Sequence, residues 1–276
     1  MASGLLGRAS AWASFGTLLG TGLGGVVTSL LVSHFGEQHL QLGYLVLPWA
    51  MLVMAAVIAL ALPGAKLSKD PHAPRLDLHE IAKGFRPPKD REFWYVYFGR
   101  LMFMIALMML VQTQTQQLRY HFGLSITEAA AIGAVLGLIL AGAAAVGTAI
   151  AGPLSDKIGR RKLPVMISTL IYVLGVAVLL VSTETWVLYV NIALAALAFG
   201  AFSSVDQALM VEILPNKDTA ARDLGFLATT NTLSGVVGGG LGAIIIAALG
   251  YHALLIIAGA LALGCLALFV PIKRVR

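Results

Sequence analysis

Eight apolar runs constrain this chain more than any other feature. They cover residues 7–32, 42–62, 93–117, 128–152, 163–182, 186–210, 224–248 and 251–271. A helix of about 20 apolar residues spans the hydrocarbon core of a bilayer. Backbone groups in lipid must be hydrogen-bonded within the protein, which favours helices in segments of this length. The runs therefore predict an all-α, polytopic membrane protein with eight transmembrane helices.

The composition excludes a soluble globular domain. The chain is 58% hydrophobic and 12% charged, with a mean hydropathy of +0.87, whereas soluble domains carry about 25% charged residues. Its single cysteine, Cys265, lies inside the last apolar run. We therefore expect no disulfide framework, no metal site and no cofactor.

The distribution of cations orients the predicted helices. Of 19 Lys and Arg residues, 17 fall at the termini or in one set of alternate loops. The opposite loops, 33–41, 118–127, 183–185 and 249–250, hold only Arg119. Because cytoplasmic loops carry the excess of Lys and Arg, both termini are expected to be cytoplasmic. We assign the chain to the plasma (inner) membrane. Topology explains the net charge of +6, so no nucleic-acid partner is expected.

One long hydrophilic segment divides the chain. Residues 63–92 contain five prolines and one short amphipathic stretch, 76–83, which we expect to form a helix on the membrane surface. The segment separates two apolar runs from six. It therefore predicts a domain boundary between residues 1–62 and 93–276.

A charged motif lies between the fourth and fifth runs. Residues 152–162 read Gly-Pro-Leu-Ser-Asp-Lys-Ile-Gly-Arg-Arg-Lys. The motif resembles the signature loop of the major facilitator superfamily, Gly-x-Leu-x-Asp-x-x-Gly-Arg-Arg-Lys. A cytoplasmic loop needs cations, but it does not need two glycines and an aspartate at these offsets. The resemblance implies a secondary transporter built from two six-helix bundles.

The resemblance also implies a domain organisation. Residues 93–276 correspond to the complete C-terminal bundle, 63–92 to the central cytoplasmic loop, and 1–62 to the last two helices of the N-terminal bundle. The first four helices are then expected to be lacking. The stretch 205–225 resembles bacterial members of the sucrose and glycoside–cation symporter type. This second resemblance implies a sugar-like solute coupled to H⁺ or Na⁺.

The signature motif is expected to act as a conformational latch. Asp156 is predicted to face the amino end of a neighbouring helix, where the helix dipole favours an anion. Arg160 is predicted to reach Glu212 or Asp206. Both contacts would form when the cytoplasmic side is closed, and they would favour the outward-open state. The predicted latch comprises Gly152, Asp156, Gly159, Arg160, Arg161, Lys162 and Glu212.

Polar residues inside the apolar runs are candidates for substrate binding or coupling. Arg8 lies at the very start of the first run, and Arg100 is the sole cation further inside a run; Arg100 is either functional or extends its side chain to the membrane surface. Helical spacing places Tyr97, Arg100 and Gln114 on one face. Asp206 is either an acid that titrates during transport or a partner of the Arg160 loop. The candidate set is Tyr97, Arg100, Gln114, Gln117, Asp206, Gln207 and Asn231.

Three functional hypotheses remain open. No catalytic triad, carboxylate pair or metal-spaced histidine cluster occurs in the sequence, so we expect no enzyme activity. The first hypothesis is transport of a small polar solute by alternating access within the lipid bilayer. The second is a drug exporter whose cavity includes Phe103, Met104, Met108 and Met109. The third is a non-transporting membrane fragment that requires its missing N-terminal helices or a homodimer partner.

Overall fold

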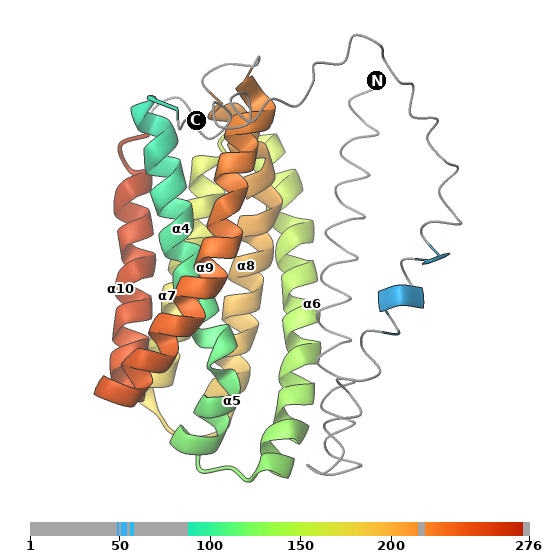
Figure 1. Ribbon diagram of the computed structural model, residues 1–276, viewed down its shortest axis with the longest axis vertical. Coiled ribbons are helices and arrows are strands. Elements are labelled where there is room, and N and C mark those ends of the chain that lie inside the picture. Colours follow the sequence, from blue (N-terminus) through green and yellow to red (C-terminus); the bar gives the residue numbers. More distant parts are fainter. Residues whose placement is uncertain (1–48, 50, 54–55, 58–87, 215–218, 273–276) are drawn as a thin grey trace.

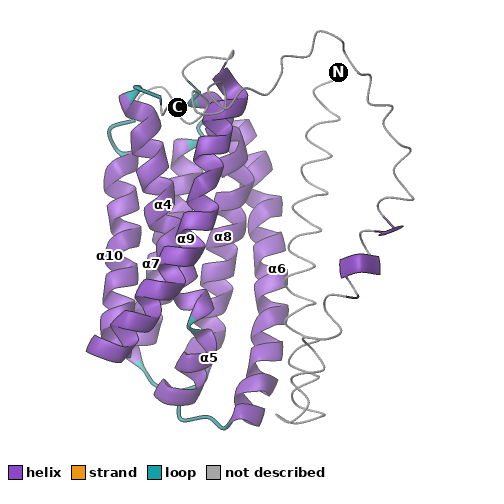
Figure 2. Cartoon of the chain, viewed as in Figure 1, coloured by secondary structure: helices purple, strands orange, loops and turns teal. Residues whose placement is uncertain are grey.

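The computed structural model describes residues 49, 51–53, 56–57, 88–214 and 219–272 of the chain. The secondary structure described for residues 88–214 and 219–272 is helical, joined by short loops (Figure 2). In chain order the elements are α4 (Arg91–Gln112), α5 (Gln114–Gln116), the π-helix η2 (Gln117–His121), α6 (Ile126–Ile158), α7 (Lys162–Val181), α8 (Trp186–Glu212), α9 (Ala220–Leu249) and α10 (Tyr251–Phe269).

Six helices in the described part of the chain are long and apolar enough to cross a membrane. They coincide with the six runs predicted between residues 93 and 271, so this part of the topology is confirmed at the level of helices. The predicted runs 7–32 and 42–62 lie almost wholly outside the described residues. So do the predicted surface helix 76–83 and most of the segment 63–92.

Local capping interactions determine where the helices begin and end. The Asp90 carboxylate accepts hydrogen bonds from the backbone N–H groups of Glu92 and Phe93 at 2.9 and 3.1 Å, which caps α4. Ser125 and Glu128 form a capping box at the start of α6. Gly159 ends α6 in the left-handed region, with a φ of 65°, where glycine carries no Cβ penalty.

Helix α6 continues further than the sequence predicts. The apolar run ends at residue 152, but the helix ends at Ile158. Asp156 therefore lies on the last turn of α6, and only residues 159–161 connect α6 to α7. Hydropathy marks the edge of the bilayer and not the end of a helix, because a helix can continue into water with polar side chains.

Helix α4 is shorter than its predicted run because the helix breaks at Thr113, where φ is −96° and ψ is 3°. The Thr113 hydroxyl donates to the carbonyl of Met109 at 2.6 Å. The Gln117 amide donates to the carbonyl of Leu110 at 3.2 Å. These side chains satisfy carbonyls near the break, which allows irregular backbone at membrane depth.

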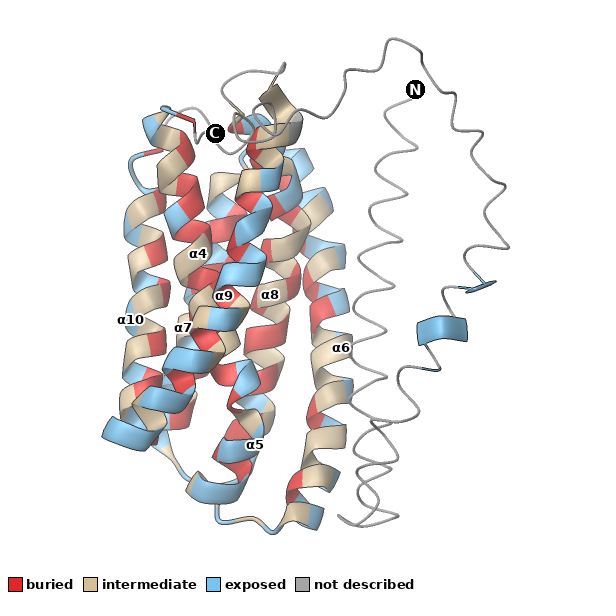
Figure 3. Cartoon of the chain, in the orientation of Figure 1, coloured by how far each residue is buried: buried red, intermediate tan, exposed pale blue. Residues whose placement is uncertain are grey.

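The packing of the helices leaves one side of the bundle open. Helix α4 packs against α9 and α10, α8 packs against α6 and α7, and α7 packs against α10 (Figure 1). Only 17% of the apolar window of α6 and of α9 is buried, against 50% for α8 (Figure 3). Helices α8 and α9 make few contacts. The exposed helices α6 and α9 therefore border an open side of the bundle.

Candidate substrate-binding site

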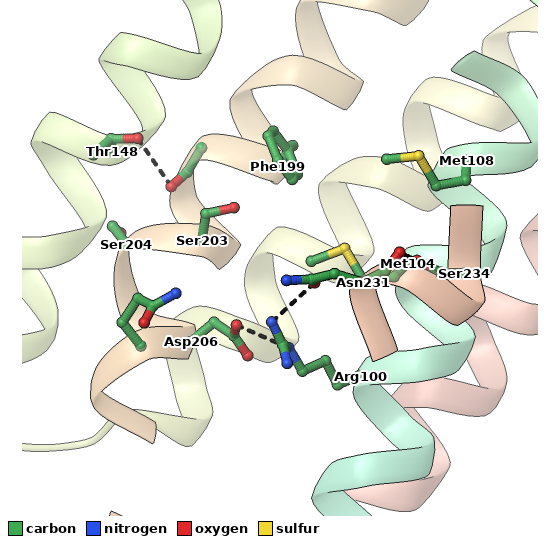
Figure 4. A pocket seen from close by; sticks show the side chains of 12 residues that line it. Arg100, Met104, Met108, Thr148, Phe199, Ser203, Ser204, Asp206, Asn231 and Ser234 are labelled. Carbon is green, nitrogen blue, oxygen red and sulfur yellow. Dashed lines mark hydrogen bonds and ion pairs between the residues drawn. The ribbon is translucent and has the colours of Figure 1, made fainter. Parts of the chain in front are cut away.

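A cavity of about 410 Å³ lies between α4, α6, α8 and α9 (Figure 4). Polar and apolar side chains share its wall, so one ligand can meet both kinds of surface. The lining residues are Arg100, Met104, Met108, Thr148, Phe199, Gly200, Ser203, Ser204, Asp206, Gln207, Asn231 and Ser234.

The positions of the lining residues along their helices give the depth of the cavity. Arg100 comes nine residues after the start of α4, Asn231 comes eleven after the start of α9, and Thr148 comes ten before the end of α6. At a rise of about 1.5 Å per residue, these residues lie roughly 15 Å from the helix ends. The hydrocarbon core is about 30 Å thick. Asp206, however, comes only six residues before the end of α8, roughly 9 Å, and α6 continues beyond its apolar run. The cavity therefore lies in the half of the bundle that contains the α6–α7 connection and extends toward the middle.

The guanidinium of Arg100 joins α4 to α9. The residue is only 2% exposed. Its Nη1 donates to the carbonyl of Leu227 at 2.7 Å and to the hydroxyl of Thr230 at 2.8 Å. Its Nη2 donates to Oδ1 of Asn231 at 3.1 Å. Arg100 therefore points into the bundle and does not extend toward the membrane surface.

Asp206 neutralises Arg100 from the opposite side of the cavity. Arg100 Nε lies 2.9 Å from Asp206 Oδ2, and the two side chains are 2% and 3% exposed. An unpaired charge buried in a membrane protein is costly, so each residue stabilises the other. The ion pair leaves two buried atoms, Arg100 Nε and Asp206 Oδ1, without a hydrogen-bond partner in the described protein. The pair thus links α4 to α8 and leaves two strong polar atoms at the cavity wall.

Four of the predicted substrate or coupling residues meet at this cavity. Arg100, Asp206 and Asn231 contact one another through the guanidinium, and Gln207 lines the same cavity with an exposed side chain. They come from α4, α8 and α9, and the packing of these helices brings them together.

Tyr97 lies beside the cavity and not in its wall. Its hydroxyl is 3.2 Å from the hydroxyl of Thr229, and its ring centroid is 5.1 Å from that of Phe226. The ring also meets Trp94 edge-on at 5.4 Å. Tyr97 therefore belongs to an aromatic cluster between α4 and α9, about one helical turn from Arg100 toward the amino end of α4.

Gln114 and Gln117 do not reach the cavity at Arg100. They line a separate cavity of about 30 Å³, together with Tyr172 and Asn191. The Gln117 amide also donates to the Thr113 hydroxyl at 2.9 Å. Because the helix breaks at Thr113, both glutamines leave the continuous helical face that the sequence predicts. The Gln117 side chain instead forms hydrogen bonds that stabilise the break.

Six residues that line the cavity belong neither to the predicted candidate set nor to the exporter hypothesis: Thr148, Phe199, Gly200, Ser203, Ser204 and Ser234. Two of them carry a signal in hindsight. Ser234 comes three residues after Asn231, so helical spacing places it on the same face. Thr148 is a hydroxyl residue within an apolar run. Its hydroxyl donates to the carbonyl of Gly200 on α8 at 3.1 Å. Nothing in the local sequence around Phe199 indicates the cavity.

The end of α6, the start of α7 and the end of α8 meet at Arg161. Its Nη1 lies 3.2 Å from Asp156 Oδ1, and its Nε contacts Glu212 Oε1. The predicted pairing of Arg160 with Glu212 or Asp206 is therefore wrong: Glu212 binds Arg161, and Asp206 binds Arg100. The extension of α6 to Ile158 explains the difference, because it places Arg161 at the amino end of α7 beside the end of α8.

The remaining residues of the signature motif have distinct structural roles. Gly159 adopts a positive φ that other residues rarely adopt. A Cβ at Gly152 would lie 3.9 Å from Ser204 Cβ, an ordinary contact. Lys162 Nζ donates to the carbonyls of Val270 and Ile272 at 2.6 and 3.2 Å. Lys162 therefore ties the start of α7 to the end of α10.

A partly polar cavity inside a bundle of membrane-spanning helices is a common feature of membrane transporters. The family described as Major Facilitator Superfamily matches residues 96–276. The chain belongs to the Major Facilitator Superfamily. A comparison with curated proteins gives no match. Members of this family are transporters and not enzymes, and the chain is an integral, multi-pass membrane protein.

Proposed function

We propose that this chain carries out secondary transport of a small polar solute, sugar-like and coupled to a cation. The observation that supports this function best is the buried ion pair of Arg100 and Asp206 at the cavity inside the helix bundle. Ionisable residues inside a membrane are expensive, and they mark substrate and ion pathways.

The proposed mechanism is alternating access around this cavity. The bundle is open between α6 and α9, and the cavity faces that side. A second group of helices on that side would complete the cavity wall. Transporters of this kind rock one bundle against another around a fixed site. We propose that the opposite wall is an N-terminal bundle whose last two helices are residues 1–62, joined through residues 63–92. A second copy of the chain is the alternative source of that wall. The cation distribution supports cytoplasmic termini in a plasma (inner) membrane.

Asp206 is the proposed coupling residue. Its Oδ1 has no hydrogen-bond partner among the described residues, whereas Oδ2 faces Arg100. Protonation of the carboxylate would remove the charge that holds α8 to Arg100. The guanidinium would then keep only its partners on α9, namely Leu227, Thr230 and Asn231. One proton would thereby change how α8 and α9 are connected.

The cytoplasmic contacts of Arg161 are the proposed latch. They connect the last turn of α6 to the end of α8 through the start of α7. Asp156 is 69% exposed and Glu212 is 43% exposed, so water competes for both contacts. Contacts of this strength favour one conformation of the transport cycle and still allow the protein to reach the other.

Reconstitution in liposomes tests the proposed function. Labelled neutral solutes are offered under an imposed proton gradient and, in a parallel experiment, under a sodium gradient. We expect saturable accumulation with one gradient only. Asp206→Asn should lose accumulation while retaining exchange of labelled for unlabelled solute. If neither gradient drives any uptake, including after helices of a longer chain are supplied, the protein is a non-transporting membrane protein.

A second candidate function is export of amphipathic organic molecules. It is favoured by three apolar side chains in the cavity wall, Met104, Met108 and Phe199. Phe103 and Met109, which the sequence had associated with this function, are fully buried and do not line the cavity. A lipophilic cation in the liposome experiment separates the two functions, because only an exporter of this kind would move it.

A further inference from the structure

We propose that His121 and His252 form a proton-binding site at the end of the bundle opposite the α6–α7 connection, and that proton uptake there releases η2 from α10. The site is separate from the cavity at Arg100, and it does not depend on the proposed transport function. Figure 1 shows α5 and the junction of α9 with α10 at the same end of the bundle. The distribution of cations along the sequence favours an outer position for this end.

His121, the last residue of η2, packs against the first turn of α10. Its ring centroid lies 4.2 Å from that of Tyr251, with 38° between the planes, and 5.3 Å from that of His252. Tyr251 is buried, His121 is half-buried and His252 is exposed. The contact therefore joins an imidazole that is partly enclosed by protein to a second imidazole that water reaches directly.

The hydrogen bonding around His121 fits its neutral form. His121 Nε2 is buried and has no hydrogen-bond partner among the described residues, and the same holds for Tyr251 Oη. A neutral imidazole carries a hydrogen on one nitrogen only, whereas an imidazolium carries one on each. Protonation in this packing would therefore bury a charged N–H group without an acceptor. Such a group is costly, so the proton favours a conformation in which the His121 ring reaches water.

Neighbouring charges do not compensate a charge on His121. On η2, the Arg119 guanidinium lies 5.7 Å from the centroid of the Tyr120 ring. On α6, which also contacts η2, the Glu128 carboxylate accepts from the backbone N–H and the hydroxyl of Ser125 at 2.9 and 2.7 Å.

Among the described residues no carboxylate forms an ion pair with either imidazole. On α10, Tyr251 is uncharged in the pH range in which histidine titrates. The group that acquires a charge opposite His121 is therefore His252, and two imidazolium ions repel each other.

The backbone on both sides of η2 allows this segment to move without α4. The helix break at Thr113 separates residues 114–121 from α4, and Gly123, with a φ of 68°, begins the connection to α6. Short irregular positions of this kind absorb the change in backbone angles when a segment moves. Loss of the ring contacts of His121 would therefore release the end of η2 while α4 stays packed.

The direction of the pH dependence follows from the two charges. Above about pH 6.5 both imidazoles are mostly neutral, so the contact between η2 and α10 is retained. As the pH falls through this range, His252 takes up a proton from water. Further acidification charges His121, and the contact is lost. Uptake of one proton on release changes the equilibrium by up to about tenfold for each pH unit.

Hydrogen–deuterium exchange of the backbone amides tests this proposal on the full chain in nanodiscs. Exposure times are scaled for the effect of pH on the chemical exchange rate. Between about pH 7 and about pH 5, exchange of residues 114–122 should accelerate by roughly tenfold or more. Residues 162–181 of α7 are the internal control and should keep the same scaled rate.

Three variants assign the effect to the imidazoles. His121→Phe keeps a ring against Tyr251 but cannot take up a proton, so residues 114–122 should stay protected at every pH. His252→Gln removes the opposing charge and should move the acceleration to lower pH. Arg119→Gln removes a charge of η2 whose guanidinium lies over Tyr120, and the pH dependence should be unchanged.

The proposal is refuted if exchange of residues 114–122 does not depend on pH in the unsubstituted chain. Equal acceleration in residues 162–181 would also refute it, because that result indicates general acid unfolding. Full pH dependence in both His121→Phe and His252→Gln would exclude the two imidazoles. If His121→Phe does not fold, the unsubstituted chain, His252→Gln and Arg119→Gln still decide. None of these measurements needs a solute or a gradient, so they stay interpretable if the proposed transport function fails.

Discussion

The hydroxyl of Thr148 donates to the carbonyl of Gly200 at 3.1 Å, and this bond joins α6 to α8 at the wall of the cavity. The two backbones approach closely because each helix places a glycine at the crossing, Gly147 on α6 and Gly200 on α8. A Cβ at Gly200 would lie 2.0 Å from the carbonyl oxygen of Ala144, and one at Gly147 would lie 2.2 Å from that of Leu197. Small residues permit this kind of approach between membrane helices.

The first prediction concerns this crossing. Gly200→Ala and Gly147→Ala should each push α6 away from α8, because the new methyl group meets rigid backbone atoms. Overpacking of this kind costs about 1–3 kcal/mol. Thermal unfolding of the purified protein should show lower stability for both variants. Gly142→Ala on the same helix is the control, since a Cβ there meets nothing within 4 Å. Equal stability of all three variants would contradict the predicted close approach.

The second prediction concerns the ion pair. Arg100→Met leaves Asp206 buried without its partner, and Asp206→Leu leaves Arg100 in the same position; removal of one partner costs about 3–5 kcal/mol. The double variant removes both charges and should recover part of the stability lost in either single variant. Chemical unfolding of the four proteins measures the coupling between the two sites. Strictly additive losses would show that the pair contributes no coupling energy.

The helices of residues 93–271 could be predicted because length and hydropathy determine them. Each predicted run overlaps an observed helix, and the first and last residues of the two differ by at most six positions. Hydropathy does not detect the break at Thr113, where side-chain hydrogen bonds from Thr113 and Gln117 replace part of the helical ladder. The same break explains why Gln114 and Gln117 are absent from the cavity at Arg100.

The site was predictable as a set of polar residues and not as a set of contacts. Arg100, Asp206 and Asn231 were identifiable because polar groups are rare in apolar runs. That Arg100 pairs with Asp206 depends on how α4 and α8 are rotated and shifted against each other, over a separation of 106 residues. The choice between Arg160 and Arg161 depends in the same way on where α6 ends.

The third prediction concerns topology. Glu184 lies between α7 and α8, whereas Lys157 lies near the end of α6, and both are exposed. A thiol installed by Glu184→Cys should react with a membrane-impermeant maleimide added to intact cells. One installed by Lys157→Cys should react only after the membrane is permeabilised, because cation-rich loops are cytoplasmic. The unsubstituted chain is the control, since Cys265 is buried. Reaction of both positions from the same side would refute the assigned orientation.

The last prediction concerns the latch, and it distinguishes the role of Arg161 from that of Arg160. Arg161→Gln and Glu212→Gln each break the contact between α7 and α8. Asp156→Asn weakens the contact of α6 with the same guanidinium. Exposed ion pairs contribute up to about 1 kcal/mol, so each variant should shift the closed and open populations by no more than roughly fivefold. The readout is the labelling rate of a thiol installed by Ser203→Cys, measured from the cytoplasmic side of inverted vesicles. All three variants should accelerate labelling.

Lys157→Gln removes a charge from the same helix end without touching Arg161 and is the control, and Arg160→Gln should change the rate less than Arg161→Gln does. A larger effect at Arg160, or unchanged labelling in all of the variants, would show that the contacts of Arg161 do not control access to the cavity.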